Sequence, residues 1–156
     1  MTSNTSRSES QPQHFHPKGK MPTAHTRAVL DAARESLPFH DTRDFAECER
    51  GLIAHMDRKT VAADAGHDAW DMGKFDFIDA ADAYDSIHPS LQRQAKLNQD
   101  YGLYEVIPGI YQIRGFDLSQ MTFVRGKTGW IVFDVLISAE TARAGLALFR
   151  EHVGGD

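Results

Sequence analysis

Asp134 is the residue whose type and position most suggest a role in chemistry. It lies within the stretch TGWIVFDVLISAETA, where we predict that WIVFDV is a strand buried on both faces. A carboxylate near the C-terminal end of such a strand lies at the sheet edge where the sites of open α/β sheets collect. Asp134 also precedes Ser138 by a few residues, where its charge would favour a helix N-terminus. The residues alone leave both interpretations open.

The histidines do not form a pattern typical of a metal site. His14 and His16 are a His-x-His pair, but they lie in a polar stretch and Pro17 follows them. Several others are isolated, and we interpret them as surface or capping residues: His25, His40, His55, His67 and His88. We therefore predict that the chain supplies no metal ligand and no catalytic residue.

Cys48 is the single cysteine, so no disulfide can form within the chain. A role as a nucleophile would need a base partner that the sequence does not identify. The simpler interpretation is a small side chain on a helix.

The composition is that of an ordinary globular protein of about one domain, with 156 residues, 25% charged and 41% hydrophobic. The net charge is -5 and the basic residues do not cluster, so we expect no nucleic-acid partner. No stretch approaches the ~20 apolar residues of a transmembrane helix, and the N-terminus lacks the apolar core of a signal peptide. We predict no membrane association and a cytoplasmic location, or a periplasmic or secreted one if the true N-terminus differs.

The elements that must position these residues fall into three regions: a disordered tail (1–22), a helical region (23–101), and a region of strands and one helix (102–156). Thr23 caps a helix over Ala24–Leu37, whose expected buried face is Val29, Ala33 and Leu37. A second helix ends at Arg50, and a third opens at His88-Pro89-Ser90 with Gly102 as its C-terminal cap. Residues 54–73 read as a loop with one short strand at most, and 75–84 as a helical turn.

The C-terminal region is β-rich. LYEVI, IYQI, MTFV and WIVFDV read as short strands separated by turns, the first of them antiparallel. Ser138 caps a last helix, whose expected buried face is Ala142, Leu146, Phe149 and Val153. A buried strand followed by an amphipathic helix is the first half of a βαβ crossover, and its second strand is missing. The predicted class is therefore α/β (α+β), with an incomplete domain.

Five groups of residues carry a resemblance to a known family. They are Asp44-Phe45 with Arg50-Gly51-Leu52-Ile53-Ala54, Trp70-Asp71 with Phe75–Ile78, HPSLQRQAKLNQDYGLYEV, GIYQIRGFDLS and GWIVFDVLISAETA. Together they resemble the N-terminal part of the alkyl sulfatases of the metallo-β-lactamase superfamily, over about residues 39–153. The resemblance implies N-terminal helices and the first half of an αββα sandwich. It also implies a sulfuric ester hydrolase that degrades detergents such as dodecyl sulfate.

The same resemblance implies two zinc ions, held mostly by a His-x-His-x-Asp-His motif, and a dimerisation domain further along the chain. In such an enzyme Asp134 would hold the metal-binding loop by hydrogen bonds without binding the metal. The motif is absent here. Glu151-His152 is similar to its end, but the upstream ligand positions fall on Ala147 and Phe149, which cannot bind a metal.

The chain departs from the family pattern at four positions. The family usually has Asn where this chain has Gln120, and Pro where this chain has Val135. These two changes put the usual catalytic geometry in question. The family also has Asn and Trp where this chain has His88 and Gln92.

The predicted function is that of an N-terminal fragment of an alkyl sulfatase, inactive and free of zinc by itself, so its status as an enzyme stays open. One alternative is a non-catalytic remnant that binds a complementary C-terminal chain or forms a homodimer. Another is a different hydrolase of the superfamily, acting on a thioester, a lactone or a phosphonate ester.

Overall fold

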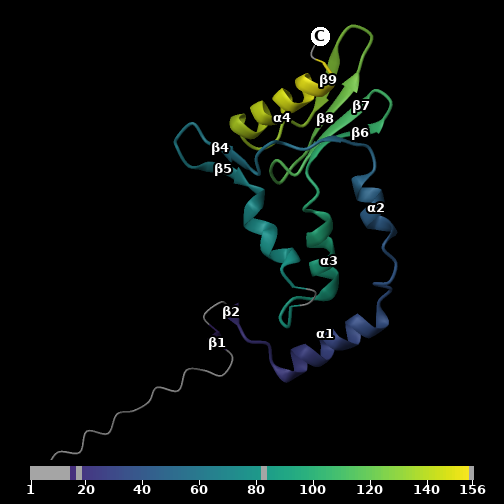
Figure 1. Ribbon diagram of the computed structural model, residues 1–156, viewed down its shortest axis with the longest axis vertical. Helices are drawn as coiled ribbons and strands as arrows, with labels where there is room; N and C mark the ends of the chain where they lie inside the picture. Colours follow the sequence, from purple (N-terminus) through teal and green to yellow (C-terminus); the bar gives the residue numbers. More distant parts are fainter. Residues whose placement is uncertain (1–14, 17–18, 82–83, 155–156) are drawn as a thin grey trace, which may run out of the picture.

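A five-stranded sheet organises the C-terminal part of the chain in this computed structural model, which describes residues 15–16, 19–81 and 84–154 (Figure 1). The strand order is β3 (Leu52–Ala54), β6 (Gly102–Ile107), β7 (Ile110–Arg114), β8 (Met121–Arg125) and β9 (Trp130–Phe133). Each neighbouring pair is antiparallel, and short turns join the last four strands as successive hairpins. The predicted mixture of helices and antiparallel strands is confirmed.

The position of β9 corrects one prediction. It is an edge strand that pairs with β8 alone among the described residues, and Ile131 and Phe133 are 54% and 59% exposed. WIVFDV was expected to be buried on both faces because it is almost wholly apolar. Burial also requires neighbours on both sides, and the described residues supply them on one side only.

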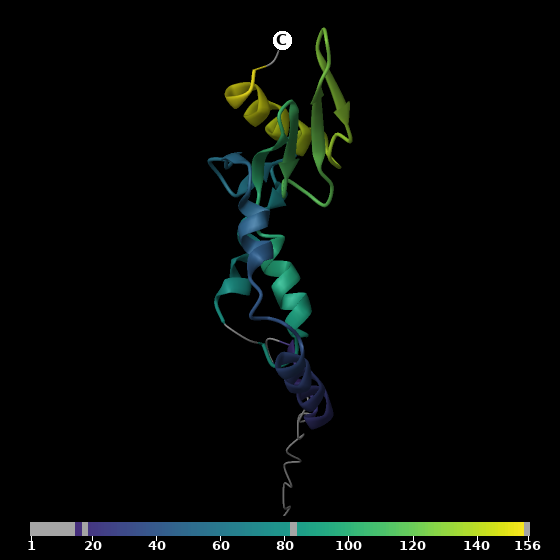
Figure 2. The same cartoon turned by 90° about the vertical axis from the view of Figure 1, so that its right-hand side faces the viewer.

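Helix α4 (Ala139–His152) covers one face of the sheet (Figure 2). It begins with a capping box, in which the Ser138 side chain accepts from the Thr141 amide while the Thr141 hydroxyl accepts from the Ser138 amide. Phe149 is buried as predicted and stacks on Phe123 of β8 with a centroid distance of 3.8 Å. Ala142, Leu146 and Val153 are partly buried and pack against the same core, as predicted. Leu148 is buried in addition, because Gly145 faces Ile113 and Leu136 and brings that row of the helix against the sheet.

The N-terminal helices extend away from the sheet (Figure 1). They are α1 (Ala24–Ser36), α2 (Arg43–Glu49), the 3-10 helix η1 (Met72–Asp79) and α3 (Pro89–Leu97). Thr23 caps α1 and His88 caps α3, as predicted. The buried face of α1 was predicted wrongly, since Leu30 is 6% exposed and Val29 is 50% exposed. Leu30 shares its face with Arg34, which donates to the Tyr84 carbonyl, so this side meets the rest of the chain.

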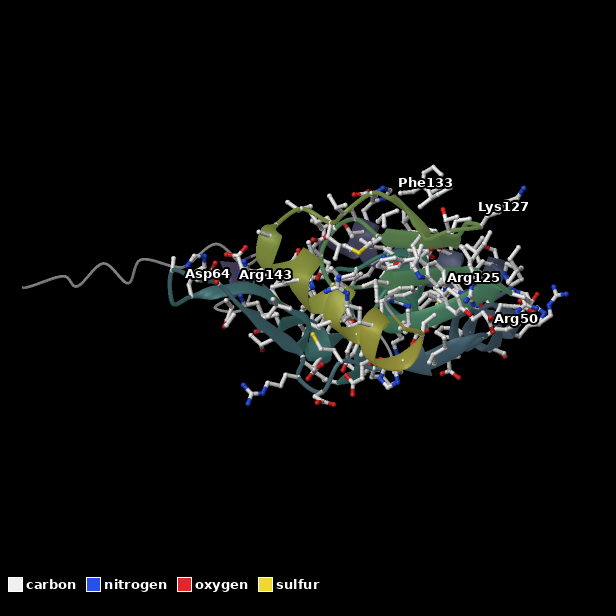
Figure 3. The ribbon with its side chains drawn as sticks, turned by 90° about the horizontal axis from the view of Figure 1, so that it is seen from above. Arg50, Asp64, Arg125, Lys127, Phe133 and Arg143 are labelled. Carbon is white, nitrogen blue, oxygen red and sulfur yellow. The ribbon has the colours of Figure 1, made fainter. Side chains whose placement is uncertain are left out.

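The segment 54–73, predicted as a loop with one short strand at most, contains a hairpin of β4 (Thr60–Ala62) and β5 (Asp68–Asp71). An ion pair of 2.8 Å between Asp64 and Arg143 links its turn to α4 (Figure 3). Gly102 opens β6 and does not cap α3, whose C-cap is Asn98. A side chain at Gly102 would collide with the Ala54 carbonyl, so the glycine permits the close approach of β3.

The tail predicted to be disordered lies mostly outside the described residues. Within it, β1 (Phe15–His16) and β2 (Gly19–Lys20) form a short antiparallel pair. The predicted boundaries near residues 22 and 101 stay predictions. Strand β3 lies before the second of them and pairs with β6, so the helical region contributes a strand to the sheet.

Candidate functional site

Two loops meet at one edge of the sheet, and they form the candidate site. Strands β7 and β9 both pair antiparallel with β8, so they run in the same direction and end at the same edge. The loop 115–120 follows β7 and the loop 134–138 follows β9. Each is anchored by an apolar side chain in the core, Phe116 at 0% and Leu136 at 7% exposure.

Asp117 joins the two loops. Its Oδ1 atom accepts from the amide and hydroxyl of Ser119, at 2.7 Å and 3.2 Å. Its Oδ2 atom accepts from the Ile137 amide and the Thr141 hydroxyl, both at 2.7 Å. Asp117 is 9% exposed, and a buried carboxylate is tolerated only when donors satisfy it in this way. It therefore holds loop 134–138 and the start of α4 against loop 115–120.

Asp134 has a different environment from the one that its type suggested. Its side chain is exposed, and its Oδ1 atom accepts from the amides of Val135 and Leu136, at 2.7 Å and 3.2 Å. Asp134 and Leu136 have φ angles of 58° and 66°, which non-glycine residues rarely adopt. Asp134 thus stabilises a strained turn of its own loop, and its support of a metal-binding loop stays a prediction. Sequence reasoning missed Asp117, although the spacing Asp-x-Ser is typical of a side chain that bonds backbone two residues on.

A cavity of about 630 Å³ lies beside loop 115–120. Trp70, Met72, Phe75 and Ile78 of the β5–η1 segment provide apolar lining, and the Trp70 indole donates to the Gly115 carbonyl at 3.1 Å. Arg114 is the one cationic side chain among the described lining residues. Its guanidinium lies 4.4 Å from the Tyr104 ring centroid and donates to Gln112 at 2.7 Å. Asp100 and Asp117 also line the cavity, so its charged lining carries both signs, and its apolar wall is the part that suits an apolar ligand.

Two of the four departures from the family pattern lie in or near this site. Gln120 lines the cavity, and Val135 is 59% exposed on loop 134–138. The other two are farther away on α3, where His88 is the N-cap and the Gln92 side chain donates to the Ala81 carbonyl at 3.1 Å.

Cys48 also lines the cavity. Burial, followed by the neighbouring Asp100 carboxylate, raises the pKa of the Cys48 thiol to about 11. The thiol donates to the Leu97 carbonyl at 3.4 Å. A thiol with this pKa is neutral near pH 7, and this favours the interpretation as a small helix side chain over that of a nucleophile.

Cys48 is therefore expected to resist alkylation. At pH 8 the folded chain should react with iodoacetamide on the order of a hundredfold more slowly than a free thiol of ordinary pKa, because little thiolate is present. Mass spectrometry of timed samples measures the rate, and the chain unfolded in guanidinium is the control. Equal rates in the folded and unfolded chain would contradict the raised pKa.

The described residues do not fit a zinc site. They contain no group of three or more His, Cys, Asp or Glu side chains that could hold a metal ion. His55 bonds the Tyr101 carbonyl at 2.8 Å, and His152 is in the last turn of α4. His14 of the His-x-His pair lies outside the described residues. Across those same residues, no helix has the length and apolar character needed to cross a membrane.

The sequence is similar to two curated proteins of Pseudomonas sp, although no family model matches the chain. It is 42% identical over 133 residues to an (R)-specific secondary-alkylsulfatase and 43% identical over 134 residues to a linear primary-alkylsulfatase. Each match covers 85% of this chain, but the chain spans only 20% of the length of either relative.

The fold agrees with the sequence similarity. The solved structure of the stereoselective inverting sec-alkylsulfatase Pisa1 from Pseudomonas sp matches with a TM-score of 0.76 at 42% identity. That match covers 83% of this chain and 20% of the solved chain. This protein is therefore homologous to the N-terminal part of the alkylsulfatases.

Proposed function

We propose that this chain is the N-terminal part of an enzyme that hydrolyses alkyl sulfates to an alcohol and sulfate. The observation that carries the proposal is the identity of 42% and 43% to two alkylsulfatases over nearly all of the described chain. These residues would supply two parts of the site: the loops 115–120 and 134–138, which Asp117 joins, and the cavity beside loop 115–120. The apolar wall of the cavity supports this role, because it would suit the alkyl chain of an alkyl sulfate.

The water-activating group would come from elsewhere in such an enzyme. Two zinc ions, expected from the family resemblance, would lower the pKa of bound water, and the described residues offer no set of ligands for them. The 156 residues alone are therefore proposed to be inactive, and no step of the reaction is assigned to them. Their contribution would be to shape one wall of the site and to hold its loops.

The proposal predicts that the purified chain alone releases no sulfate from dodecyl sulfate, whereas a chimera that contains it does. The purified chain should release no sulfate and retain no stoichiometric zinc. A chimera should release sulfate when this chain replaces the homologous fifth of the Pseudomonas linear primary-alkylsulfatase. Ion chromatography measures the sulfate, and the unmodified relative is the positive control. Sulfate release with stoichiometric zinc from the chain alone would overturn the predicted inactivity, and a folded but inactive chimera would count against the function.

A second candidate function is that of a non-catalytic chain that binds a complementary polypeptide. The exposed apolar side chains of β9 favour it, because monomeric proteins usually protect such an edge. The chimera distinguishes the two candidates, since a purely binding role predicts assembly without sulfate release.

A further inference from the structure

We propose that the β4–β5 hairpin positions loop 115–120 for the reaction, and that Trp70 is the positioning residue. The inference rests on the proposed function and deepens it, because it names an element outside the two loops that sets their geometry. Trp70 acts through the backbone of loop 115–120 and not on a reacting atom. Asp117 joins the two loops from within, whereas the hairpin supports them from outside.

The indole of Trp70 reaches the first residue of loop 115–120. Its Nε1 atom donates to the Gly115 carbonyl at 3.1 Å, across 45 residues of sequence. Gly115 has a φ of 75°, and a Cβ atom there would lie 2.5 Å from the Cβ atom of Tyr101, so its backbone packs directly against Tyr101. The start of the loop is therefore held from two directions. Asp117 follows two residues later, so the same contacts place the carboxylate that reaches the second loop.

The hairpin in turn holds the backbone of Trp70. Trp70 pairs with Val61, which is 7% exposed, in the antiparallel ladder of β4 and β5. The Met72 amide donates to the Lys59 carbonyl at 2.9 Å and closes the end of the ladder. The indole also lies 6.3 Å from the ring of Phe75, between centroids. A donor that is already fixed in this way loses little freedom when it bonds the loop.

The turn of the same hairpin contacts α4, the helix that follows loop 134–138 (Figure 3). The Asp64 carboxylate accepts from Arg143 at 2.8 Å, and the Asp64 amide donates to Glu140 at 3.3 Å. Both partners lie in the first two turns of α4. Asp64 and Arg143 are exposed, so their ion pair adds little stability. What the contacts provide is a second link between the segments that carry the two loops.

Loop 115–120 needs such support because its tip is not packed. Leu118, Ser119 and Gln120 line the cavity, and Leu118 is 83% exposed. Contacts at the base of the loop, at Gly115 and Phe116, therefore determine where these side chains lie. A misplacement of about 1 Å can cost on the order of a hundredfold in rate, so a small shift of the loop is expected to be visible in kcat.

Removal of the indole N–H tests the proposal in the chain alone and in the chimera with the Pseudomonas linear primary-alkylsulfatase. Trp70→Phe removes the donor. Trp70→benzothienylalanine, introduced at an amber codon, also removes it but keeps the size of the ring that lines the cavity. In the chain alone the amides of Ser119 and Ile137, which donate to Asp117, should exchange about fivefold faster. In the chimera with benzothienylalanine, kcat for dodecyl sulfate should fall about fivefold while KM changes less than about twofold.

Trp130→Phe is the matched control. It makes the same change at the start of β9, at the other end of the strands from the two loops. Trp130 lies edge to face on Phe149 at 4.9 Å between centroids, so this variant should lower the Tm of the chimera and leave its kcat unchanged well below the Tm. A role of Trp70 in stability alone predicts instead that kcat is unchanged in every folded variant.

The other outcomes count against the hairpin or against the function. Unchanged exchange of the Ser119 and Ile137 amides in the Trp70 variants would overturn the support of the loop, whether or not the chimera releases sulfate. Faster exchange with unchanged kcat, or failure of both Trp70 variants to fold, would limit Trp70 to a structural role and overturn the proposal. A folded chimera that is inactive before any substitution contradicts the proposed function. The exchange rates of the chain alone then decide separately whether the hairpin holds the loop.

Discussion

Replacement of Asp117 by alanine is expected to lower the free energy of unfolding by about 2–4 kcal/mol. The change removes the acceptor for the Ile137 amide and the Thr141 hydroxyl, and Thr141 is 1% exposed. Asp117→Asn should also destabilise, because both carboxylate oxygens accept from donors and an amide offers one acceptor and one donor group. Guanidinium unfolding followed by circular dichroism measures both variants.

Asp134→Asn is the matched control for the Asp117 variants. Asp134 accepts through Oδ1 alone, so an asparagine oxygen can replace it, and asparagine tolerates a positive φ. Its effect on the free energy of unfolding should stay within about 0.5 kcal/mol. If Asp134→Asn destabilised the chain as much as Asp117→Asn, the assignment of Asp117 as the residue that joins the loops would be wrong.

Phe149→Ala is expected to lower the free energy of unfolding by about 3–5 kcal/mol, because it leaves a cavity where a large core side chain was. Phe149 is 1% exposed, stacks on Phe123, and contacts the rings of Tyr111 and Trp130 edge to face. Loss of these contacts would weaken the packing of the C-terminal half of α4 on the sheet. Thermal and guanidinium unfolding measure the change.

Phe133→Ala makes the same chemical change at a 59% exposed position. It should alter the free energy of unfolding of the chain alone by less than about 1 kcal/mol. Similar losses for the two phenylalanine variants of the chain alone would contradict the observed position of β9 at an exposed edge.

The sequence alone determined the features that depend on neighbouring residues. Thr23, His88 and Ser138 each begin a helix where predicted, since a cap requires only a side chain and amides a few residues away. The order of antiparallel strands after residue 102 was also predicted, because alternating β-prone runs and turn residues are local signals. The family resemblance was predicted from short motifs and is confirmed by the similarity to the alkylsulfatases.

Only the tertiary structure decided which side chains are buried and which carboxylate joins the loops. Leu30 and Leu148 are buried because of the elements that pack against them. The spacing of apolar residues along a helix does not by itself show which of two adjacent rows of side chains faces the core. Asp117 reaches Thr141 across 24 residues of sequence, whereas Asp134, the more conspicuous residue, bonds its own loop. The apolar run of β9 predicted a strand correctly, but burial also depends on neighbours, and among the described residues β9 pairs with β8 alone.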